Sequence, residues 1–321
     1  MTHQPGETWT ADDVLSDVEL RGKRFLITGV SSGVGVETAR SLVARGATVV
    51  GTVRDVAKAT EPTAPIRDAA RAGQGTLALV ALDLASLASV RECADKLLAD
   101  GRAFDGVITN AGVMATPRGK TADGFETQFG TNHLGHFVLV NRIASLIAAG
   151  GRLVSLSSNA HRGSDVDLDD PNFVHTPYDR WLAYNRSKTA NALFAVAFDH
   201  RHRAHGVRAS AVMPGTSDTG LMRHLSKEEL DDVMARIDAD RAAAGVGPLK
   251  LKTVEQMAAT PVWAAVVADG DKVGGLYLEN CHVAGIDDVP GIRDGVMSYA
   301  LDPHRAELLW AKSEELVGER F

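Results

Sequence analysis

Tyr184 and Lys188 are the residues best suited to acid–base chemistry, and they lie four positions apart in an apolar run. Helix geometry places side chains at positions i and i+4 on one face, so both can contact the same ligand. An ammonium group beside a phenol favours the phenolate, and we therefore expect Lys188 to lower the pKa of Tyr184. Tyr184 would then exchange a proton near neutral pH. The pair would also suit a solvated helix face, so its meaning depends on the elements that position it.

A glycine-rich segment, Thr28–Gly35, lies between a short apolar run and an amphipathic run. Gly29, Gly33 and Gly35 would allow a tight turn and a close approach of the backbone to a pyrophosphate. The N–H groups and the dipole at the start of the following helix would favour the same anion. The segment therefore favours a dinucleotide site, although glycines also occur in turns that bind nothing.

The composition excludes several classes of protein. The chain has 321 residues, 45% apolar and 23% charged, so it can fold around a sizeable core. Its net charge of −7 argues against nucleic-acid binding. No apolar run is long enough to cross a bilayer, and Met1–Leu20 is polar and acidic, unlike a secretory signal. Cys93 and Cys281 form no disulfide or metal motif, so we expect a cytoplasmic protein without a metal.

Short apolar runs alternate with amphipathic segments along most of the chain. This alternation predicts a doubly wound α/β fold, with a parallel sheet covered by helices on both faces. We expect an N-terminal extension (1–22), a single domain (23–285) with a substrate lid at about 215–250, and a C-terminal extension with a helix (286–321). The expected strands are 25–28, 48–53, 77–82, 106–109, 152–156, 207–212 and 275–278, and the expected helices are 34–44, 90–98, 125–149, 181–202, 254–267 and 307–316.

Further motifs follow the glycine-rich segment in a fixed order. They are Asp83-Leu84, Asn110-Ala111-Gly112, Asn132, Ser157-Ser158, Tyr184, Lys188, Pro214-Gly215 and Thr219. In these motifs and their order, residues 22–285 resemble the short-chain dehydrogenase/reductase family, which implies a Rossmann fold. The segments 121–126, 132–137 and 184–191 are similar to the retinol dehydrogenase and WW-domain-oxidoreductase branch, and light-dependent protochlorophyllide reductases are also similar.

The resemblance implies a catalytic tetrad of Asn132, Ser158, Tyr184 and Lys188. Hydride would pass between a nicotinamide and a carbonyl carbon, while Tyr184 gives or takes a proton at the oxygen. Lys188 would hold the nicotinamide ribose, and Ser158 would hydrogen-bond the substrate oxygen. Asn132 would hold a helix distortion or a water that carries the proton onward. Ser157 is the alternative to Ser158, and the resemblance favours the second serine of the pair.

The resemblance also implies which residues bind the cofactor. The residue after the second strand often selects the nucleotide, by an acidic group for NAD or an arginine for the 2′-phosphate of NADP. Val53 stands where an acidic group would be, and Arg54 suits a phosphate, so we favour NADP(H) over NAD(H). Arg54 could instead pair with Asp55 or solvent, and Ser32 departs from the basic residue of many NADP-preferring members. The implied cofactor-binding residues are Thr28, Gly29, Ser31, Ser32, Gly33, Val34, Gly35, Arg54, Asp83, Leu84, Asn110, Ala111, Gly112, Tyr184, Lys188, Pro214, Gly215 and Thr219.

The expected reaction interconverts an alcohol and a carbonyl, and the branch suggests a lipophilic substrate. An apolar lid containing Leu221, Met222 and Leu225 would cover it. The acidic insertion 163–180 could line the pocket or lie in solvent. Reduction of a carbon–carbon double bond and NADP(H) sensing without turnover are the alternatives.

Two helices and three histidines also bear on the site. The helices at 125–149 and 181–202 are apolar enough to pair in a homodimer or homotetramer, or to be buried within one subunit. We expect His133 and His136 to pack the first of these helices. His161 follows Ser158 closely and could line the pocket.

Overall fold

The computed structural model describes residues 6–217, 226–243 and 245–321. An eight-stranded sheet in the order β3-β2-β1-β4-β5-β6-β7-β8 forms its centre. Strands β1 to β7 pair in parallel, and β8 runs antiparallel at the edge. The strands are β1 (Arg24–Thr28), β2 (Thr48–Val53), β3 (Thr76–Ala81), β4 (Phe104–Thr109), β5 (Ile147–Leu156), β6 (Arg208–Met213), β7 (Tyr277–Glu279) and β8 (His282–Val283).

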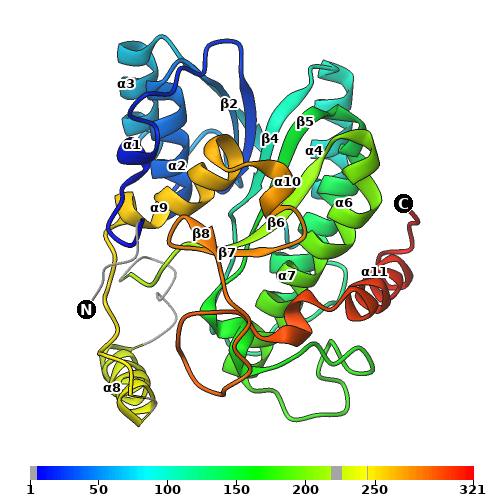
Figure 1. Ribbon diagram of the computed structural model, residues 1–321. Helices are drawn as coiled ribbons and strands as arrows, with labels where there is room; N and C mark the ends of the chain where they lie inside the picture. Colours follow the sequence, from blue (N-terminus) through cyan, green and yellow to red (C-terminus); the bar gives the residue numbers. More distant parts are fainter. Residues whose placement is uncertain (1–5, 218–225, 244) are drawn as a thin grey trace.

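Helices cover both faces of this sheet (Figure 1). One layer contains α1 (Ala11–Val14), α2 (Gly33–Ala44), α3 (Ala64–Gly73) and α9 (Val254–Val262). The other contains α4 (Leu87–Asp100), α6 (Gly135–Arg142), α7 (Arg180–His202) and α11 (Pro303–Val317). The central strands β1 and β4 are almost wholly buried apolar runs, as expected for a parallel sheet that is covered on both faces. The predicted doubly wound α/β fold is therefore confirmed.

The sheet order creates a switch point between β1 and β4. The chain runs outward from β1 through β2 to β3, and then returns to build β4 to β7 on the other side. Crevices beyond the carboxyl ends of the strands at such a point bind ligands in open α/β sheets. The sequence motifs lie at this edge, because each follows a strand end: Gly29 after β1, Arg54 after β2, Asp83 after β3, Asn110 after β4, Ser158 after β5 and Pro214 after β6.

The expected helix 125–149 differs from the structure. It is divided into α5 (Thr127–Phe129), a π turn η1 (Gly130–Leu134) and α6, and it ends at Arg142. A 3-10 turn η2 (Ala144–Leu146) follows, and β5 already begins at Ile147, so the last third of the prediction is wrong. Apolar residues 143–149 fit a helix or a strand equally well. Pairing of Ile147 with Phe104 and the left-handed φ of Gly150 decide for a strand.

The expected helix 254–267 likewise ends early. Regular helix stops at Val262, and a π turn η6 (Trp263–Val267) completes the segment. Pro261 lies inside the helix and lacks the N–H that a regular helical bond requires. The wider turn therefore follows the point where the hydrogen-bond ladder is broken.

Three segments surround the carboxyl edge of the sheet. Helix α8 (Lys227–Ala243) lies apart from both helical layers (Figure 1). Thr219 and the lid residues Leu221, Met222 and Leu225 lie outside the described residues. The insertion 163–180 is a loop fastened by Asp170, whose carboxylate accepts three backbone N–H bonds and one from the Thr176 hydroxyl. Residues 284–302 lead into α11, and the buried side chains among them pack against α7, β6 and β7. The remaining short elements are α10 (Gly270–Val273), η3 (Asn159–Gly163), η4 (Arg203–His205) and η7 (Ser298–Leu301).

Candidate active site

The turn after β1 forms an anion cradle at the start of α2. Gly29 and Gly33 adopt left-handed φ values of 75° and 56°, which favour glycine. A Cβ on Gly35 would collide with the carbonyl oxygen of Gly29. Ser32 is the N-cap residue of α2 but makes no capping bond through its side chain. The first N–H groups of α2 are therefore left for an anion, as a bound pyrophosphate requires.

Hydrogen bonds between β1 and β4 hold this turn in place. The Asn110 amide donates to the carbonyl oxygens of Thr28 at 2.8 Å and Gly29 at 3.2 Å. The Ala111 N–H donates to the Thr28 hydroxyl at 3.0 Å, and that hydroxyl lies 2.9 Å from Nε2 of His136. Gly112 packs so close to Asn132 that a Cβ at position 112 would lie 3.0 Å from Oδ1 of Asn132. The Asn110-Ala111-Gly112 segment thus joins the nucleotide turn to the proposed tetrad.

The end of β2 presents a basic side chain. Arg54 is exposed and, within the described part of the chain, makes no hydrogen bond or ion pair. Asp55 instead lies 3.3 Å from Nζ of Lys58 and accepts the N–H groups of residues 57 and 58. The alternative pairing of Arg54 with Asp55 is therefore absent from the structure. Asp83 caps its own turn at the N–H of Ala85, at 3.0 Å.

Tyr184 and Lys188 lie on α7, and both are almost fully buried. Nζ of Lys188 donates to the carbonyl oxygen of Leu156 at 3.1 Å and lies 5.7 Å from the Tyr184 ring centroid. Burial raises the pKa of Tyr184 to about 12, against the opposing effect of the Ser158 hydroxyl. Burial also lowers the pKa of Lys188 to about 8. In this structure burial therefore sets the direction of the tyrosine pKa, and the expected lowering by Lys188 is not among its causes.

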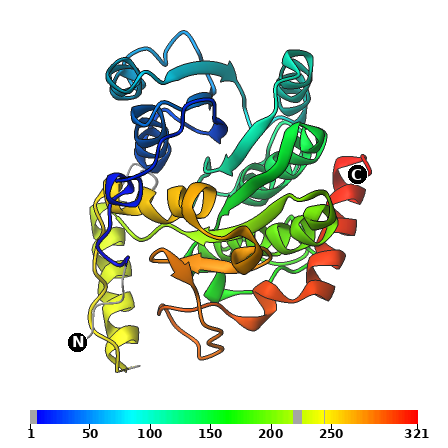
Figure 2. The same cartoon turned by 45° about the horizontal axis from the view of Figure 1, so that its top comes forward.

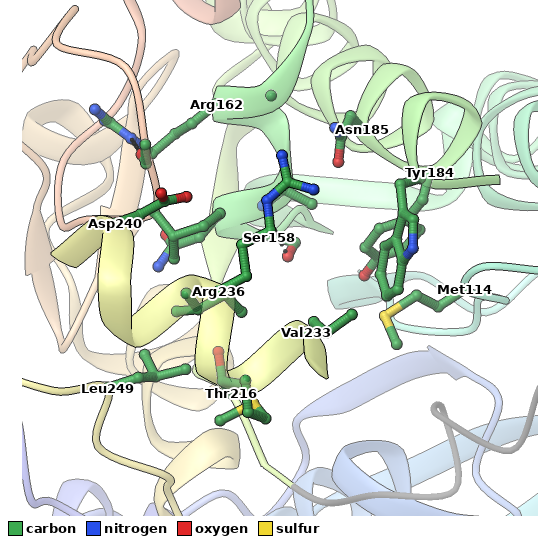
Figure 3. Close-up of a pocket in the computed structure, with 18 of the residues that line it drawn as sticks. Met114, Ser158, Arg162, Tyr184, Asn185, Thr216, Val233, Arg236, Asp240 and Leu249 are labelled. Atoms are coloured by element: carbon green, nitrogen blue, oxygen red, sulfur yellow. Dashed lines mark hydrogen bonds between the residues drawn. The ribbon is translucent and has the colours of Figure 1, made fainter. Parts of the chain in front are cut away.

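The two adjacent serines have different surroundings. Oγ of Ser157 is buried and donates to the carbonyl oxygen of Lys188 at 2.7 Å. Ser158 lines the pocket, where it lies beside the Tyr184 phenol (Figure 3). This geometry favours Ser158 as the group that meets a substrate oxygen. Ser157 instead fastens α7 to the end of β5.

Asn132 lies in the middle of the π turn η1 and is fully buried. Its Oδ1 accepts the N–H of Val113 at 2.8 Å, and its Nδ2 donates to the carbonyl of Val113 at 2.9 Å and to Ser187 at 3.0 Å. Ser187 in turn donates to the carbonyl oxygen of Tyr184 at 2.8 Å. Asn132 thus connects the loop after β4 to the helix that carries the tyrosine.

His136 and His161 each bond the backbone carbonyl of a tetrad residue. The sequence motifs did not reveal this role. His136 bonds the carbonyl oxygen of Asn132 at 2.9 Å, and His161 bonds that of Ser158 at 2.7 Å. His161 is fully covered, so it does not line the pocket. Its other nitrogen accepts the N–H of Met297 at 3.2 Å. The one signal in the sequence for these contacts is that each histidine lies within four residues of a motif residue, Asn132 or Ser158.

A pocket of about 500 Å³ opens beside Ser158 and Tyr184 (Figure 3). Apolar side chains of α8 form one wall, and the start of α7 forms another. Arg180 of α7 pairs with Glu229 of α8, which fastens the two walls together. The insertion contributes Gly163 and Asp179, so part of it does line the pocket. The apolar residues of these two walls are Trp181, Leu182, Leu230, Val233, Met234 and Ile237.

Residues 6–217, 226–243 and 245–321 contain neither a metal-binding cluster nor a membrane-spanning helix. No group of three or more His, Cys, Asp or Glu side chains there is placed to hold a metal ion. Over the same ranges, no helix combines the length and apolar character needed to cross a membrane.

Known proteins resemble the chain over most of its length. The sequence model of the short chain dehydrogenase family matches residues 23–230. A protein of Streptomyces lividans named "Probable oxidoreductase" is 39% identical over 91% of this chain and 97% of its own. Human retinol dehydrogenase 14 is 34% identical, over 93% and 87%. The crystal structure of an uncharacterized protein from Mycobacterium Paratuberculosis has a TM-score of 0.70 and 33% identity, over 98% and 99%.

Proposed function

Since this chain belongs to the short-chain dehydrogenase/reductase family, we propose that it is an NADP(H)-dependent oxidoreductase that interconverts an alcohol and a carbonyl on a lipophilic substrate. One observation carries the proposal: Ser158 and Tyr184 both face a largely apolar pocket at the carboxyl edge of the sheet. Lys188 and Asn132 support them from the buried side. The family itself makes the chain an oxidoreductase that uses NAD(P).

Each residue of the tetrad has a separate task in this proposal. The bound nicotinamide would supply or accept the hydride. The Ser158 hydroxyl holds the substrate oxygen, and the Tyr184 hydroxyl donates a proton to it during reduction. The Lys188 ammonium stabilises the phenolate that remains. Asn132 fixes the backbone at Val113 and, through Ser187, the helix turn of Tyr184.

The preference for NADP(H) rests on the end of β2. Val53 provides no acid for a ribose hydroxyl, and Arg54 is free to pair with a phosphate. A short chain dehydrogenase from Burkholderia cenocepacia J2315, 23% identical with a TM-score of 0.61 over 81% of this chain and 97% of its own, was solved in complex with NADP. Arg54→Ala should lower kcat/KM with NADPH by about tenfold to a hundredfold and leave NADH nearly unchanged. If the ratio of kcat/KM with NADPH to that with NADH were unchanged in Arg54→Ala, the assignment of NADP(H) would be wrong.

The lipophilic substrate is supported by the apolar walls of the pocket and by the retinol dehydrogenases among the relatives. A panel of aldehydes, ketones and alcohols with NADPH and NADP⁺ would test the activity by cofactor absorbance. We expect turnover of apolar carbonyl compounds and its loss in Tyr184→Phe with the cofactor still bound. Tight cofactor binding without turnover of any compound would contradict the proposal.

A homodimer or homotetramer of this chain would not associate through the outer side of α6 and α7. Helix α11 runs along the outer side of α6 and α7 within the same chain (Figure 2). Any self-association would therefore use another face. The cytoplasmic location remains a prediction.

A further inference from the structure

The substrate pocket contains four charged side chains within its mostly apolar lining. They are Arg162, Asp179, Arg236 and Asp240. A charged side chain that already has partners in the protein offers little to a ligand, whereas an accessible one without partners can pair with a ligand of opposite charge. Which of the four lack partners, and where those side chains point, therefore indicates which charge a ligand could carry near the reacting residues.

Two of the four are committed to the protein itself. The Arg162 guanidinium is turned away from the pocket and donates to carbonyl oxygens of the 289–291 segment at 2.8 and 2.5 Å. Asp179 is the N-cap residue of α7, and its carboxylate accepts two backbone N–H bonds at 2.8 and 2.7 Å. The Arg162 side chain is fully covered, although its Nη1 has no hydrogen-bond partner in the described residues, and the Asp179 carboxylate is used at the start of α7.

Like Asp240, which is also exposed and unpaired, Arg236 has no partner among the residues that the structure describes. Within the described part of the chain it makes no hydrogen bond and no ion pair, not even with Asp240 one turn further along α8. Figure 3 shows its guanidinium reaching from α8 toward Ser158 and Asn185, with the Asp240 carboxylate to its left. The two side chains thus diverge at a spacing that would allow them to pair.

The position of Arg236 on α8 explains this direction. Leu230, Val233 and Ile237 recur at helical spacing and form the stripe that faces the pocket. Arg236 lies at the margin of this stripe. A long aliphatic stem can lie along an apolar wall while its charged head remains accessible. Because Arg236 is exposed, a ligand can reach its guanidinium without breaking any contact within the protein.

We propose that Arg236 is the anion-binding group of the substrate pocket, and that the preferred substrate is an apolar alcohol or carbonyl compound carrying a carboxylate distant from the reacting carbon. The inference rests on the proposed function, which places the reacting carbon beside Ser158 and Tyr184. A guanidinium binds a carboxylate through two parallel N–H bonds, which gives both affinity and orientation. Asp240 would repel a carboxylate that extended past Arg236, and so limits the length of the substrate.

A matched pair of substrates tests the proposal. We would compare a medium-chain ω-oxo fatty acid with its methyl ester, because both present the same aldehyde and only one carries a charge. At saturating NADPH, wild-type enzyme should prefer the acid. Arg236→Ala should lower kcat/KM for the acid by about tenfold to a hundredfold, mainly through KM, and leave the ester within about twofold. Arg236→Lys should retain part of the preference, and Arg236→Glu should reverse it.

Lys227 supplies the matched control. It is an exposed cation on the same helix and is not part of the pocket lining. Lys227→Ala should leave the preference for the acid intact, whereas Asp240→Asn should increase it. An equal loss for acid and ester in Arg236→Ala, or no preference for the acid in wild type, would overturn the proposal.

A binding experiment separates this inference from the proposed function. Calorimetric titration of the NADP-loaded protein with a saturated fatty acid and its methyl ester requires no turnover. Acid binding that is lost in Arg236→Ala and kept in Lys227→Ala would support the anion site even if no aldehyde were reduced. Reduction of aldehydes by an enzyme that binds acid and ester equally would uphold the function and reject the anion site.

Discussion

Nδ1 of His136 donates a hydrogen bond of 2.9 Å to the carbonyl oxygen of Asn132. A carbonyl can only accept, so the proton must be on Nδ1, and Nε2 accepts from the Thr28 hydroxyl at 2.9 Å. One neutral imidazole therefore connects the nucleotide turn after β1 to the π turn at Asn132. A second proton on this ring would leave the Thr28 hydroxyl without its acceptor.

We predict that acid destabilises the protein through its buried histidines. Burial lowers the pKa of His136 to about 4 and that of His133 to about 3. Between these values and about 6.5, the unfolded chain binds protons that the folded chain excludes. The stabilisation is thus complete above about pH 6.5 and declines as the pH falls toward 4, by about 3 kcal/mol for His136 alone. Urea unfolding at a series of pH values would measure this slope.

His133→Phe provides the control for this pH dependence. His133 lies among Phe129, Phe137 and Phe194, so a phenyl ring suits its surroundings. The bond from His133 to Ser313 would be lost, but Ser313 would keep its bond to a backbone carbonyl. We expect a smaller loss of stability on acidification in this variant. A slope identical to wild type would exclude His133 as a contributor.

Reduction should slow as Lys188 loses its proton. Burial lowers the pKa of Lys188 to about 8, while Tyr184, with a pKa of about 12, stays protonated. The ammonium that stabilises the phenolate formed on proton transfer is therefore present below about pH 8 and absent above it. Rates of carbonyl reduction measured from about pH 6 to about pH 10 should decline with one apparent pKa near 8. Lys188→Met should be slow throughout and lack this decline.

Substitution of Ser158 should lower kcat, whereas substitution of Ser157 should lower stability. Ser158→Ala should lower kcat by about a hundredfold or more, because the developing charge on the substrate oxygen loses a donor. Ser157→Ala should instead lower stability by about 1 kcal/mol, since its hydroxyl bonds the Lys188 carbonyl inside the protein. Rates under saturating substrate and urea unfolding of both variants would separate the roles. An equal loss of kcat in the two would contradict the choice of Ser158.

The sequence was sufficient for the order of elements at the carboxyl edge of the sheet. Buried parallel strands are apolar runs with little ambiguity, and motifs such as Asn110 and Ser158 follow their ends directly. The helix at 125–149 was less predictable, because apolar residues 143–149 suit either a helix or a strand. Long-range pairing of Ile147 with Phe104 decides that point, and no local pattern contains it.

The electrostatics of the tetrad could not be predicted from spacing. The i, i+4 pattern correctly placed Tyr184 and Lys188 on one helix, and it suggested a lowered tyrosine pKa. Their almost complete burial reverses the sign, since desolvation disfavours both charged forms. Burial depends on segments far away in sequence, including the contact of His161 with Met297. Residue types therefore indicated the chemistry, whereas tertiary packing sets the pKa values.

Removing Trp310 should expose the outer face of α6 and α7. The indole packs against Phe137 and Phe194, with ring centroids 5.0 and 6.0 Å away, and Arg201 lies over it at 3.9 Å. Trp310→Ala should cost about 3–5 kcal/mol of stability and leave an apolar surface where α11 had packed. We expect concentration-dependent self-association by light scattering in the variant and none through this face in wild type. Leu308→Ala, an exposed position on the same helix, should change neither property, and self-association of that variant would contradict the covering role of α11.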